Sequence, residues 1–573
     1  MMERVKASTG PGGRGQEASV DYRFVRLLSV ILFPAVAAFA QPQINASGVV
    51  NSASYRTPGL PASGIAQGSI FTIFGTGLGG SSWVGASAFP LPITLGGTSA
   101  SVTTGTTQTS VIILGANAYQ INAILPSTTP VGAGTITVTY NGQTSPAQPI
   151  QVVASTFAMY TYNQSGAGQA VATDTNYQLN TIIHTVHPGD YISLWGTGLG
   201  AIDSSDAQPP AGGDLPGSVT VYIGNATVSA PYYHGRAPGY AGLDQVVFQV
   251  PDGIEGCYVP VGVDTGAGVG NVATIAVSSS GETCSDSVLG QDLINKLASG
   301  QKVDFAYVRL EGDFTAGFIQ YGSDVALATF SEIDPGNAGT AEYGVSSGYC
   351  YAVDCSQGCL ATNGAAYNNV LSDSSPAQLD AGAVSFVAGP EAVTGGATIP
   401  LYQSGGFYED VLSGTTGTRV LWSDLPYQVT GAGGTNVGSF SVTDNTSNAT
   451  LKFSNVSAAM VVPRSSGLQL QWTGGDATLQ NGQVTIGAYS GSSDYKQFQV
   501  LQCTAPLSAQ GFTIPSWILS TLPASGLFGG QSAEPIGFIW IGQYDTPTIF
   551  NATGLDRGII TDILYHEIEV NFQ

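Results

Sequence analysis

Hydrophobic and polar residues alternate in short runs along most of this 573-residue chain. Residues 135–140 alternate Thr with Ile, Val and Tyr before an Asn-Gly pair, and residues 218–223 alternate Ser, Thr and Tyr with Val and Ile before Gly-Asn. A period of two places apolar side chains on one face of a strand, and closely spaced turns are typical of antiparallel sandwiches. The pattern predicts an all-β protein, and apolar positions at helical spacing are almost absent.

One strand-and-turn phrase occurs twice. Residues 68–79 read GSIFTIFGTGLG and residues 189–200 read GDYISLWGTGLG. Each copy precedes a strand that runs from Gln to Pro, at residues 120–126 and 245–251. Two landmarks in the same order predict a tandem duplication of a domain of about 120 residues. We therefore expect two immunoglobulin-like β-sandwiches, at residues 41–155 and 156–285. Neither Gly-rich turn opens a helix, which excludes a dinucleotide-binding loop.

The repeated phrases also carry a family resemblance. The stretch 65–79 resembles the opening strand of IPT/TIG immunoglobulin-like domains, which ends in a similar Gly-rich turn. The stretch from Gly48 to about Val277 resembles a paired-sandwich module of uncharacterised secreted acidobacterial proteins. The shared elements are the VNSAS opening at 50–54, both GTGLG turns and the strand at 119–122. The resemblance implies an immunoglobulin-like fold and export, and it carries over no catalytic residue.

The chain changes character after the second repeat. At 286–300 we expect a helical linker, because Leu289, Leu293 and Leu297 share one face of a helix over 291–298. We expect this face to pack between the sandwiches and the rest of the chain. Residues 301–573 again show alternating runs and form a β-rich C-terminal region of one or two domains. Four phrases, at residues 379–382, 436–440, 471–476 and 511–515, resemble a second uncharacterised segment of the same secreted proteins. Turn residues are scattered throughout this region and mark no domain boundary.

The N-terminus predicts export. Arg23 and Arg26 precede an apolar run that ends in a small-residue cleavage pattern at Ala40, so residues 1–40 are expected to be a signal peptide. The predicted location is secreted, extracellular or on the cell surface, with no membrane insertion after cleavage. Only 9% of residues are charged and the net charge is −23, which disfavours a nucleic-acid partner. Extracellular polysaccharide or surface proteins are the partners expected.

Six cysteines in an exported chain predict disulfides. Cys257 and Cys284 bracket two expected strands of the second repeat, and we predict that they pair. Cys350, Cys355, Cys359 and Cys503 permit three pairings, and the sequence leaves the choice open. A zinc site is disfavoured because no Cys-x2-Cys pair and no nearby His complete a ligand set.

Candidate catalytic groups form no coherent set. Ser346 lies in a Gly-x-Ser-x-Gly match, but no strand-turn-helix context surrounds it. The histidines are widely separated or badly spaced for chelation in an extended segment, and His566 is expected on a strand surface. Local carboxylate pairs were considered for glycoside hydrolysis, although catalytic acids usually sit on different strands. These candidates are His184, His187, His234 and His566, and the pairs Glu311 with Asp313, Glu332 with Asp334, and Glu409 with Asp410.

Aromatic residues give the remaining hint of function. Tyr232 and Tyr233 are adjacent, so in a strand they point to opposite faces and at least one can be exposed to sugar rings. No cofactor is predicted, and calcium is left open at Asp174 and Asn176. The leading hypothesis is a non-enzymatic protein for adhesion, matrix or glycan binding. The alternatives are a carbohydrate-active enzyme with its site in 301–573, or a structural subunit of a surface layer or fibre.

Overall fold

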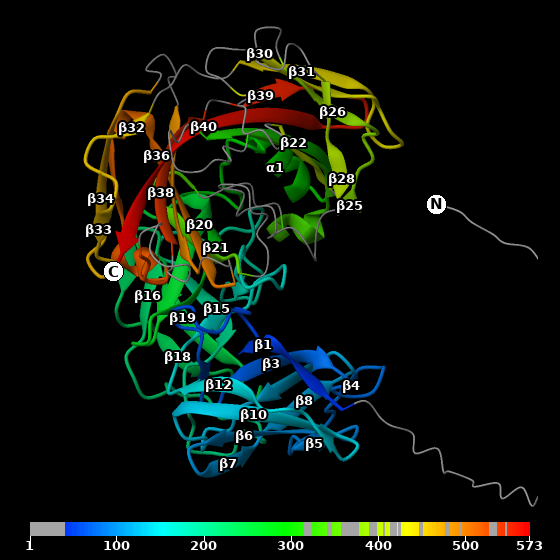
Figure 1. Ribbon diagram of the computed structural model, residues 1–573, viewed down its shortest axis with the longest axis vertical. Helices are drawn as coiled ribbons and strands as arrows, with labels where there is room; N and C mark the ends of the chain where they lie inside the picture. The colour runs from blue at the N-terminus through cyan, green and yellow to red at the C-terminus, as the bar shows by residue number, and fades with distance from the viewer. Residues whose placement is uncertain are drawn as a thin grey trace, which may run out of the picture. The chain divides into compact units, whose positions relative to one another are not determined.

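The computed structural model describes most of the chain beyond residue 40 as β-sheet (Figure 1). This result confirms the all-β class. Within the described residues no helix has the length and apolar character that a bilayer span requires. The expected signal peptide lies outside them. The described ranges are 41–313, 324–340, 346–356, 377–388, 398–404, 407–412, 421, 426–445, 451–475, 482–492, 496–526, 536–544 and 547–573.

The first repeat is a sandwich of two sheets, in the orders β1-β3-β9-β8-β4 and β2-β12-β10-β6-β5. In β6 buried and half-buried residues alternate strictly, as expected for a strand with one face on a core. Phe71 and Ile73 of β3 point into that core, whereas Thr72 lies on the opposite face of its sheet. The strands are β1 Gln43–Asn51, β2 Ile65–Ala66, β3 Ile70–Thr76, β4 Val84–Gly85, β5 Thr94–Leu95, β6 Thr98–Thr104, β7 Thr107–Ser110, β8 Ile112–Ala116, β9 Gln120–Ile124, β10 Gly132–Tyr140, β11 Gln143–Thr144 and β12 Gln148–Val153.

The second repeat is also a sandwich, with sheets in the orders β13-β15-β19-β18 and β17-β16-β20-β21. Both copies of the repeated phrase form the expected strand, β3 in the first sandwich and β15 in the second. Every residue of β21 is buried because both of its faces are covered by apolar side chains. The strands are β13 Ala158–Met159, β14 Ala172–Thr173, β15 Tyr191–Thr197, β16 Thr220–Ile223, β17 Ala226–Val228, β18 Tyr233–Arg236, β19 Asp244–Gln249, β20 Gly256–Asp264 and β21 Val269–Val277.

Helix α1 (Gln291–Ala298) occupies the range that the leucine spacing predicted. Leu289, Leu293 and Leu297 are buried in one apolar cluster. That cluster also contains Ile182 of the second repeat and Phe305 of the C-terminal region. The helix therefore packs between the second sandwich and the C-terminal strands, as expected.

The C-terminal region is built around a twelve-stranded sheet, with smaller sheets in the orders β27-β26-β30-β31 and β32-β34-β37. Short helices Pro335–Thr340 (η1), Leu507–Ala509 (η3) and Ser516–Leu519 (α2) connect strands. The strands are β22 Val303–Asp313, β23 Val325–Ile333, β24 Cys350–Asp354, β25 Ala377–Gln378, β26 Val384–Val387, β27 Thr398–Pro400, β28 Tyr402–Ser404, β29 Phe407–Val411, β30 Pro426–Gly431, β31 Phe440–Asn445, β32 Lys452–Phe453, β33 Met460–Val462, β34 Leu468–Thr473, β35 Gln483–Gly491, β36 Phe498–Pro506, β37 Gly511–Ile514, β38 Ile536–Tyr544, β39 Thr548–Phe550 and β40 Arg557–Phe572.

Strand β40 connects two hydrophobic cores. Ile560 and Leu564 in its first half belong to a core between the large sheet and β26, β30 and β31, which we call the C-terminal core. Val570 and Phe572 in its second half belong to a core that also contains the interior of the second sandwich, which we call the shared core. The strand pairs in parallel with β22 and antiparallel with β38, so it is held along most of its length (Figure 1).

A buried polar network joins the two sandwiches. Asp244 accepts hydrogen bonds from the backbone amides of Gly198 and Leu199 at 2.6 and 2.8 Å and forms an ion pair with Arg236. Arg236 also donates to the carbonyl of Gly68, which begins the repeated phrase in the first sandwich, at 3.0 Å. The second Gly-rich turn is thereby fixed against the first repeat by groups that water does not reach, since both charged side chains are almost completely buried.

Candidate functional site: a pocket between the sandwiches

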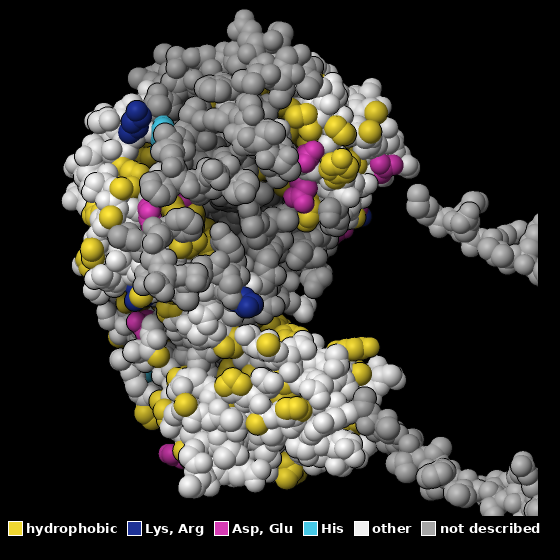
Figure 2. Space-filling view, viewed as in Figure 1, with side chains coloured by type: hydrophobic (Ala, Val, Ile, Leu, Met, Phe, Trp, Pro, Cys, Tyr) yellow, Lys and Arg dark blue, Asp and Glu magenta, His cyan; other side chains and the backbone are white. Residues whose placement is uncertain are grey.

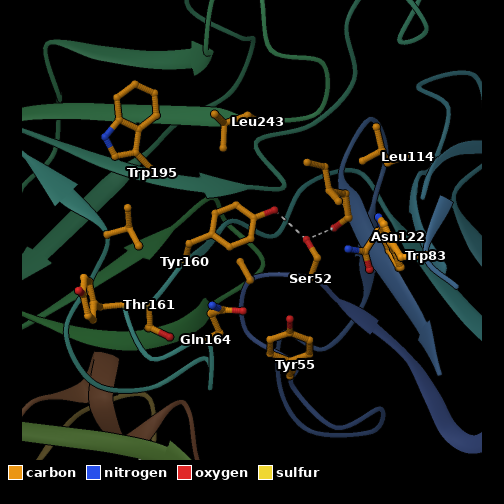
Figure 3. A pocket seen from close by; sticks show the side chains of 14 residues that line it. Ser52, Tyr55, Trp83, Leu114, Asn122, Tyr160, Thr161, Gln164, Trp195 and Leu243 are labelled. Carbon is orange, nitrogen blue, oxygen red and sulfur yellow. Dashed lines mark hydrogen bonds between the residues drawn. The ribbon is translucent and has the colours of Figure 1, made fainter. Parts of the chain in front are cut away.

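The candidate site is a pocket of about 700 Å³ whose walls come from both sandwiches (Figure 3). The first sandwich contributes the outward faces of β3, β8 and β9 and the loop after β1. The second contributes the segment after β13, strand β15 and the loop before β19. The lining residues are Ser52, Ala53, Tyr55, Ile70, Trp83, Leu114, Asn122, Tyr160, Thr161, Tyr162, Gln164, Val171, Trp195 and Leu243.

Aromatic rings from the two sandwiches face this pocket from different sides. Figure 3 shows Trp83 on the side of the first sandwich and Trp195 on the side of the second, with Tyr160 between them. The indole nitrogen of Trp195 donates to the Thr173 hydroxyl at 3.0 Å, which fixes the orientation of its ring. Trp83 has 48% of its surface exposed. The pocket therefore offers one fixed, partly buried indole and one that is open to solvent.

The polar groups of the pocket are neutral. Ser52 lies 2.8 Å from the Tyr160 hydroxyl and donates to the Ile70 carbonyl at 3.1 Å. Burial raises the pKa of Tyr160 above its ordinary range and also raises the pKa of Tyr55, so both phenols keep their protons. None of the lining side chains carries a charge.

Asn122 adds an oriented amide. Its Oδ1 atom accepts hydrogen bonds from the Thr72 hydroxyl at 3.2 Å and from Nε2 of the Gln120 side chain at 2.9 Å. These two contacts occupy the oxygen, so the Nδ2 atom is the donor left for a ligand. A pocket with aromatic faces, hydroxyls and an oriented amide suits an uncharged ligand that combines apolar faces with hydroxyl groups.

The low fraction of charged residues in the sequence is also visible on the surface. On the face drawn in Figure 2, Lys, Arg, Asp and Glu side chains are few among the described atoms, and most of the coloured side chains are hydrophobic. This face offers few charged partners to a ligand, and the net charge of −23 repels an anionic ligand at long range. It is consistent with a pocket that selects by shape and hydrogen bonding.

The structure contains the predicted disulfide between Cys257 and Cys284. Of the pairings that the sequence left open, it contains Cys350 with Cys503, directly opposite each other on β24 and β36. Cys355 is also disulfide-bonded, and Cys359 lies outside the described residues. Bonds of this kind are typical of proteins from oxidising compartments.

The histidines lie on separate elements, and the Ser346 hydroxyl is hydrogen-bonded to the backbone of β20. Ser346 accepts a hydrogen bond from the Tyr258 amide at 2.9 Å, which ties its segment to β20. His187 contacts Asp190 at 3.0 Å and His234 contacts Asp214 at 3.5 Å, on separate elements. His566 is half-buried rather than on the surface, because β40 lies inside the large sheet.

The carboxylate pairs take part in local contacts. Glu311 is buried and ion-paired with Arg309, and burial raises the pKa of Glu311. Lys302 lies 2.5 Å from Glu332 and 3.7 Å from Asp334. Glu409 and Asp410 are half-buried neighbours in β29, while the side chain of Asp313 lies outside the description.

Asp174 and Asn176, where the sequence left calcium open, lie in a local turn. Asp174 accepts from the backbone amides of Asn176 and Gln178, both at 2.8 Å. Across the described ranges, no group of three or more His, Cys, Asp or Glu side chains is placed to hold a metal ion. Of the two adjacent tyrosines, Tyr232 is 75% exposed and packs edge-on against Tyr191, whereas Tyr233 is half-buried. Neither lines the pocket.

The pocket itself was missed by the sequence analysis. Its residues come from segments whose motifs indicate only strands and repeats, namely the VNSAS opening, strand β9, which contains Asn122, and strand β15, which contains Trp195. The repeats gave no signal for these residues, because Asn122 corresponds to Val247 in the second repeat and Trp195 corresponds to Phe74 in the first, and neither counterpart lines the pocket. Only the packing of the two repeats brings these positions together.

No family model and no curated protein matches this chain, so the acidobacterial and IPT/TIG resemblances remain predictions. Among solved structures, titin domains A168–A170 match at a TM-score of 0.12 and 10% identity, over 68% of this chain and 92% of that one. Domains 4–9 of the surface layer protein SbsC match at a TM-score of 0.17 and 10% identity, over 92% of this chain and 65% of that one. An Escherichia coli alpha-2-macroglobulin matches at a TM-score of 0.14 and 11% identity, over 91% of this chain and 43% of that one. TM-scores this low establish no shared overall structure, so the fold class rests on the strands of this chain.

Proposed function

We propose that this is an exported, non-enzymatic protein that binds a neutral glycan in the pocket between its two sandwiches. The observation that carries the proposal is the pocket lining, in which five aromatic rings from both sandwiches surround hydroxyl and amide groups without any charge. Pyranose rings have apolar faces that stack on aromatic side chains and hydroxyl edges that hydrogen-bond to amides. The disulfides support an extracellular setting.

The first test is retention on insoluble polysaccharides, with and without calcium, using residues 41–573, which form one compact unit. The protein would be produced in an oxidising compartment, and the supernatants would be assayed for released sugars. Retention without sugar release is the expected result. Sugar release would overturn the non-enzymatic proposal and favour a carbohydrate-active enzyme. Absence of both retention and release would refute glycan binding and favour the structural-subunit alternative.

A pair of variants locates the site. Trp83→Ala removes a half-exposed ring from the pocket, and we expect it to weaken retention about tenfold through loss of one stacking surface. Tyr232→Ala removes an exposed ring outside the pocket and serves as the matched control. Equal retention of both variants would show that any glycan binds elsewhere on the surface.

A further inference from the structure

The loop that follows β1 contributes Ser52, Ala53 and Tyr55 to the pocket. Its first turn is held locally, because the side chain of Asn51 accepts from the amide of Ala53 at 2.8 Å. Tyr55 has a φ of 50°, a left-handed conformation that is disfavoured for a residue with a side chain. Such a conformation persists where the surroundings impose it. The loop therefore depends on contacts that hold Tyr55 in this conformation.

For residues 56–58 those contacts come mainly from the C-terminal region. Arg56 is 3% exposed and its Nη2 atom donates to the carbonyl of Thr521 at 2.8 Å. The next amide, that of Thr57, donates to Asp354 at 2.7 Å. The Gln497 side chain donates to the carbonyl of Pro58 at 3.0 Å. Three consecutive residues of the loop are thus tied to three separate segments of the C-terminal region.

Burying a guanidinium at this position is costly. Burial lowers the pKa of Arg56 to about 10, and the nearby Asp354 carboxylate opposes this effect. The Arg56 Nε atom makes no hydrogen bond within the described part of the chain. A neutral side chain would fill the same space without the desolvation penalty. What the guanidinium adds is a directed contact from the loop to the Thr521 carbonyl at 2.8 Å, together with a longer contact to the Gly270 carbonyl of the second sandwich at 3.5 Å.

We propose that Arg56 is a positioning residue that anchors the pocket loop, residues 51–58, to the C-terminal region and so holds the pocket ready for its ligand. The proposal rests on the function proposed above. It gives the C-terminal region a role in binding although none of its described residues lines the pocket. A loop that is already ordered loses less conformational entropy when the ligand binds.

The test compares Arg56→Met with Arg464→Met. Arg464 is a matched control because it donates to the carbonyl of Leu522, next to Thr521, and among the described residues no hydrogen bond joins it to the loop. In the free protein, we expect amide hydrogen exchange at Ala53 and Tyr55 to be at least tenfold faster in Arg56→Met and unchanged in Arg464→Met. Arg56→Lys, which keeps a charged donor, should restore much of the protection.

Ligand binding gives a second readout on the polysaccharide that the unmodified protein retains. We expect about tenfold weaker binding for Arg56→Met, with the loss in the entropy of binding rather than its enthalpy. If a folded Arg56→Met protein shows normal exchange and normal affinity, the inference is overturned while the proposed function stands. If the unmodified protein retains no polysaccharide, the proposed function fails and the exchange rates still decide the inference.

A variant that does not fold would be replaced by Gln497→Ala, which removes only the contact to Pro58 and leaves Arg56 in place. This variant should speed exchange in the loop to a smaller extent, because two of the three anchors remain. Unchanged exchange in Gln497→Ala would contradict anchoring by the C-terminal region. The three anchors can then be ranked by their separate effects on the same amides.

Discussion

The buried ion pair between Arg236 and Asp244 gives the sharpest test of how the sandwiches are joined. Their side chains are 1% and 0% exposed, so replacing Arg236 with Met leaves a carboxylate in a site without water. Removing one partner of a buried pair typically costs about 3–5 kcal/mol. Asp244 keeps its two backbone donors at Gly198 and Leu199, which places the expected loss near the lower end, about 3 kcal/mol.

A double-mutant cycle separates the charge from the packing. Asn at position 244 can still accept from the two amides, so Arg236→Met combined with Asp244→Asn leaves no buried charge. We expect the double variant to be more stable than the sum of the single losses predicts, by about 2 kcal/mol. Denaturant unfolding of residues 41–573, followed by tryptophan fluorescence, measures each free energy of unfolding. Lys302→Met, in an exposed ion pair with Glu332, is the control and should change stability little.

The result that would refute this reasoning is additivity. If the single variants lose less than about 1 kcal/mol each and their effects simply add, the pair is hydrated and does not lock the junction. The contact of Arg236 with Gly68 predicts a further effect. Loss of the guanidinium should also increase proteolysis at the junction between the sandwiches under native conditions.

Three further predictions concern other parts of the chain. Gly242→Ala should lower the free energy of unfolding by about 2–4 kcal/mol, because φ is +74° and the new Cβ would lie 2.6 Å from Ile70. The control is Gly239→Ala, where φ is +85° but the space is open, and thermal unfolding should show less than half that loss of stability. A disulfide that closes a longer loop removes more entropy from the unfolded chain. Loss of Cys350–Cys503, with a sequence separation of 153, should therefore cost about 5 kcal/mol of stability, and loss of Cys257–Cys284, with a separation of 27, about 3.5 kcal/mol. Calorimetry of the two variants in which both cysteines of one bond are replaced by Ala should reproduce that order. Hydrogen bonds from Thr435 and Gly382 lower the pKa of Asp380. The contribution of Asp380 to stability is therefore present above the unfolded pKa of about 3.9 and is lost as the pH falls below that value. Amide exchange at Thr435 should accelerate only below that pH, and Asp380→Asn should abolish this pH dependence.

The sequence was sufficient for features that depend on local periodicity. Alternation predicted the strands, and the leucine spacing at 289, 293 and 297 predicted helix α1 together with its buried face. The repeated phrase predicted two equivalent strands, which became β3 and β15. Each of these signals lies within about a dozen neighbouring residues, where the direction of a side chain follows from the geometry of one element.

Features that depend on distant contacts were not predictable. Ser52, Asn122 and Trp195 contribute to one pocket, yet each occurs in a separate strand or loop, and the motifs around them indicate strands and turns rather than a shared site. Cys350 and Cys503 are 153 residues apart, and nothing local favoured their pairing over the alternatives. Arg56 lies in a polar, Pro-containing stretch that reads as a surface loop. Its burial depends on residues more than 200 positions away.

Strand β40 has a thermodynamic consequence for the whole C-terminal half. Its first half belongs to the C-terminal core and its second half to the shared core, which includes the interior of the second sandwich. Opening either core far enough to release this strand also withdraws apolar side chains from the other. Sub-global openings that spare one core are therefore suppressed, and the slowest-exchanging amides of both should report the same free energy of opening. We therefore expect the second sandwich and the C-terminal region to unfold as a single cooperative unit.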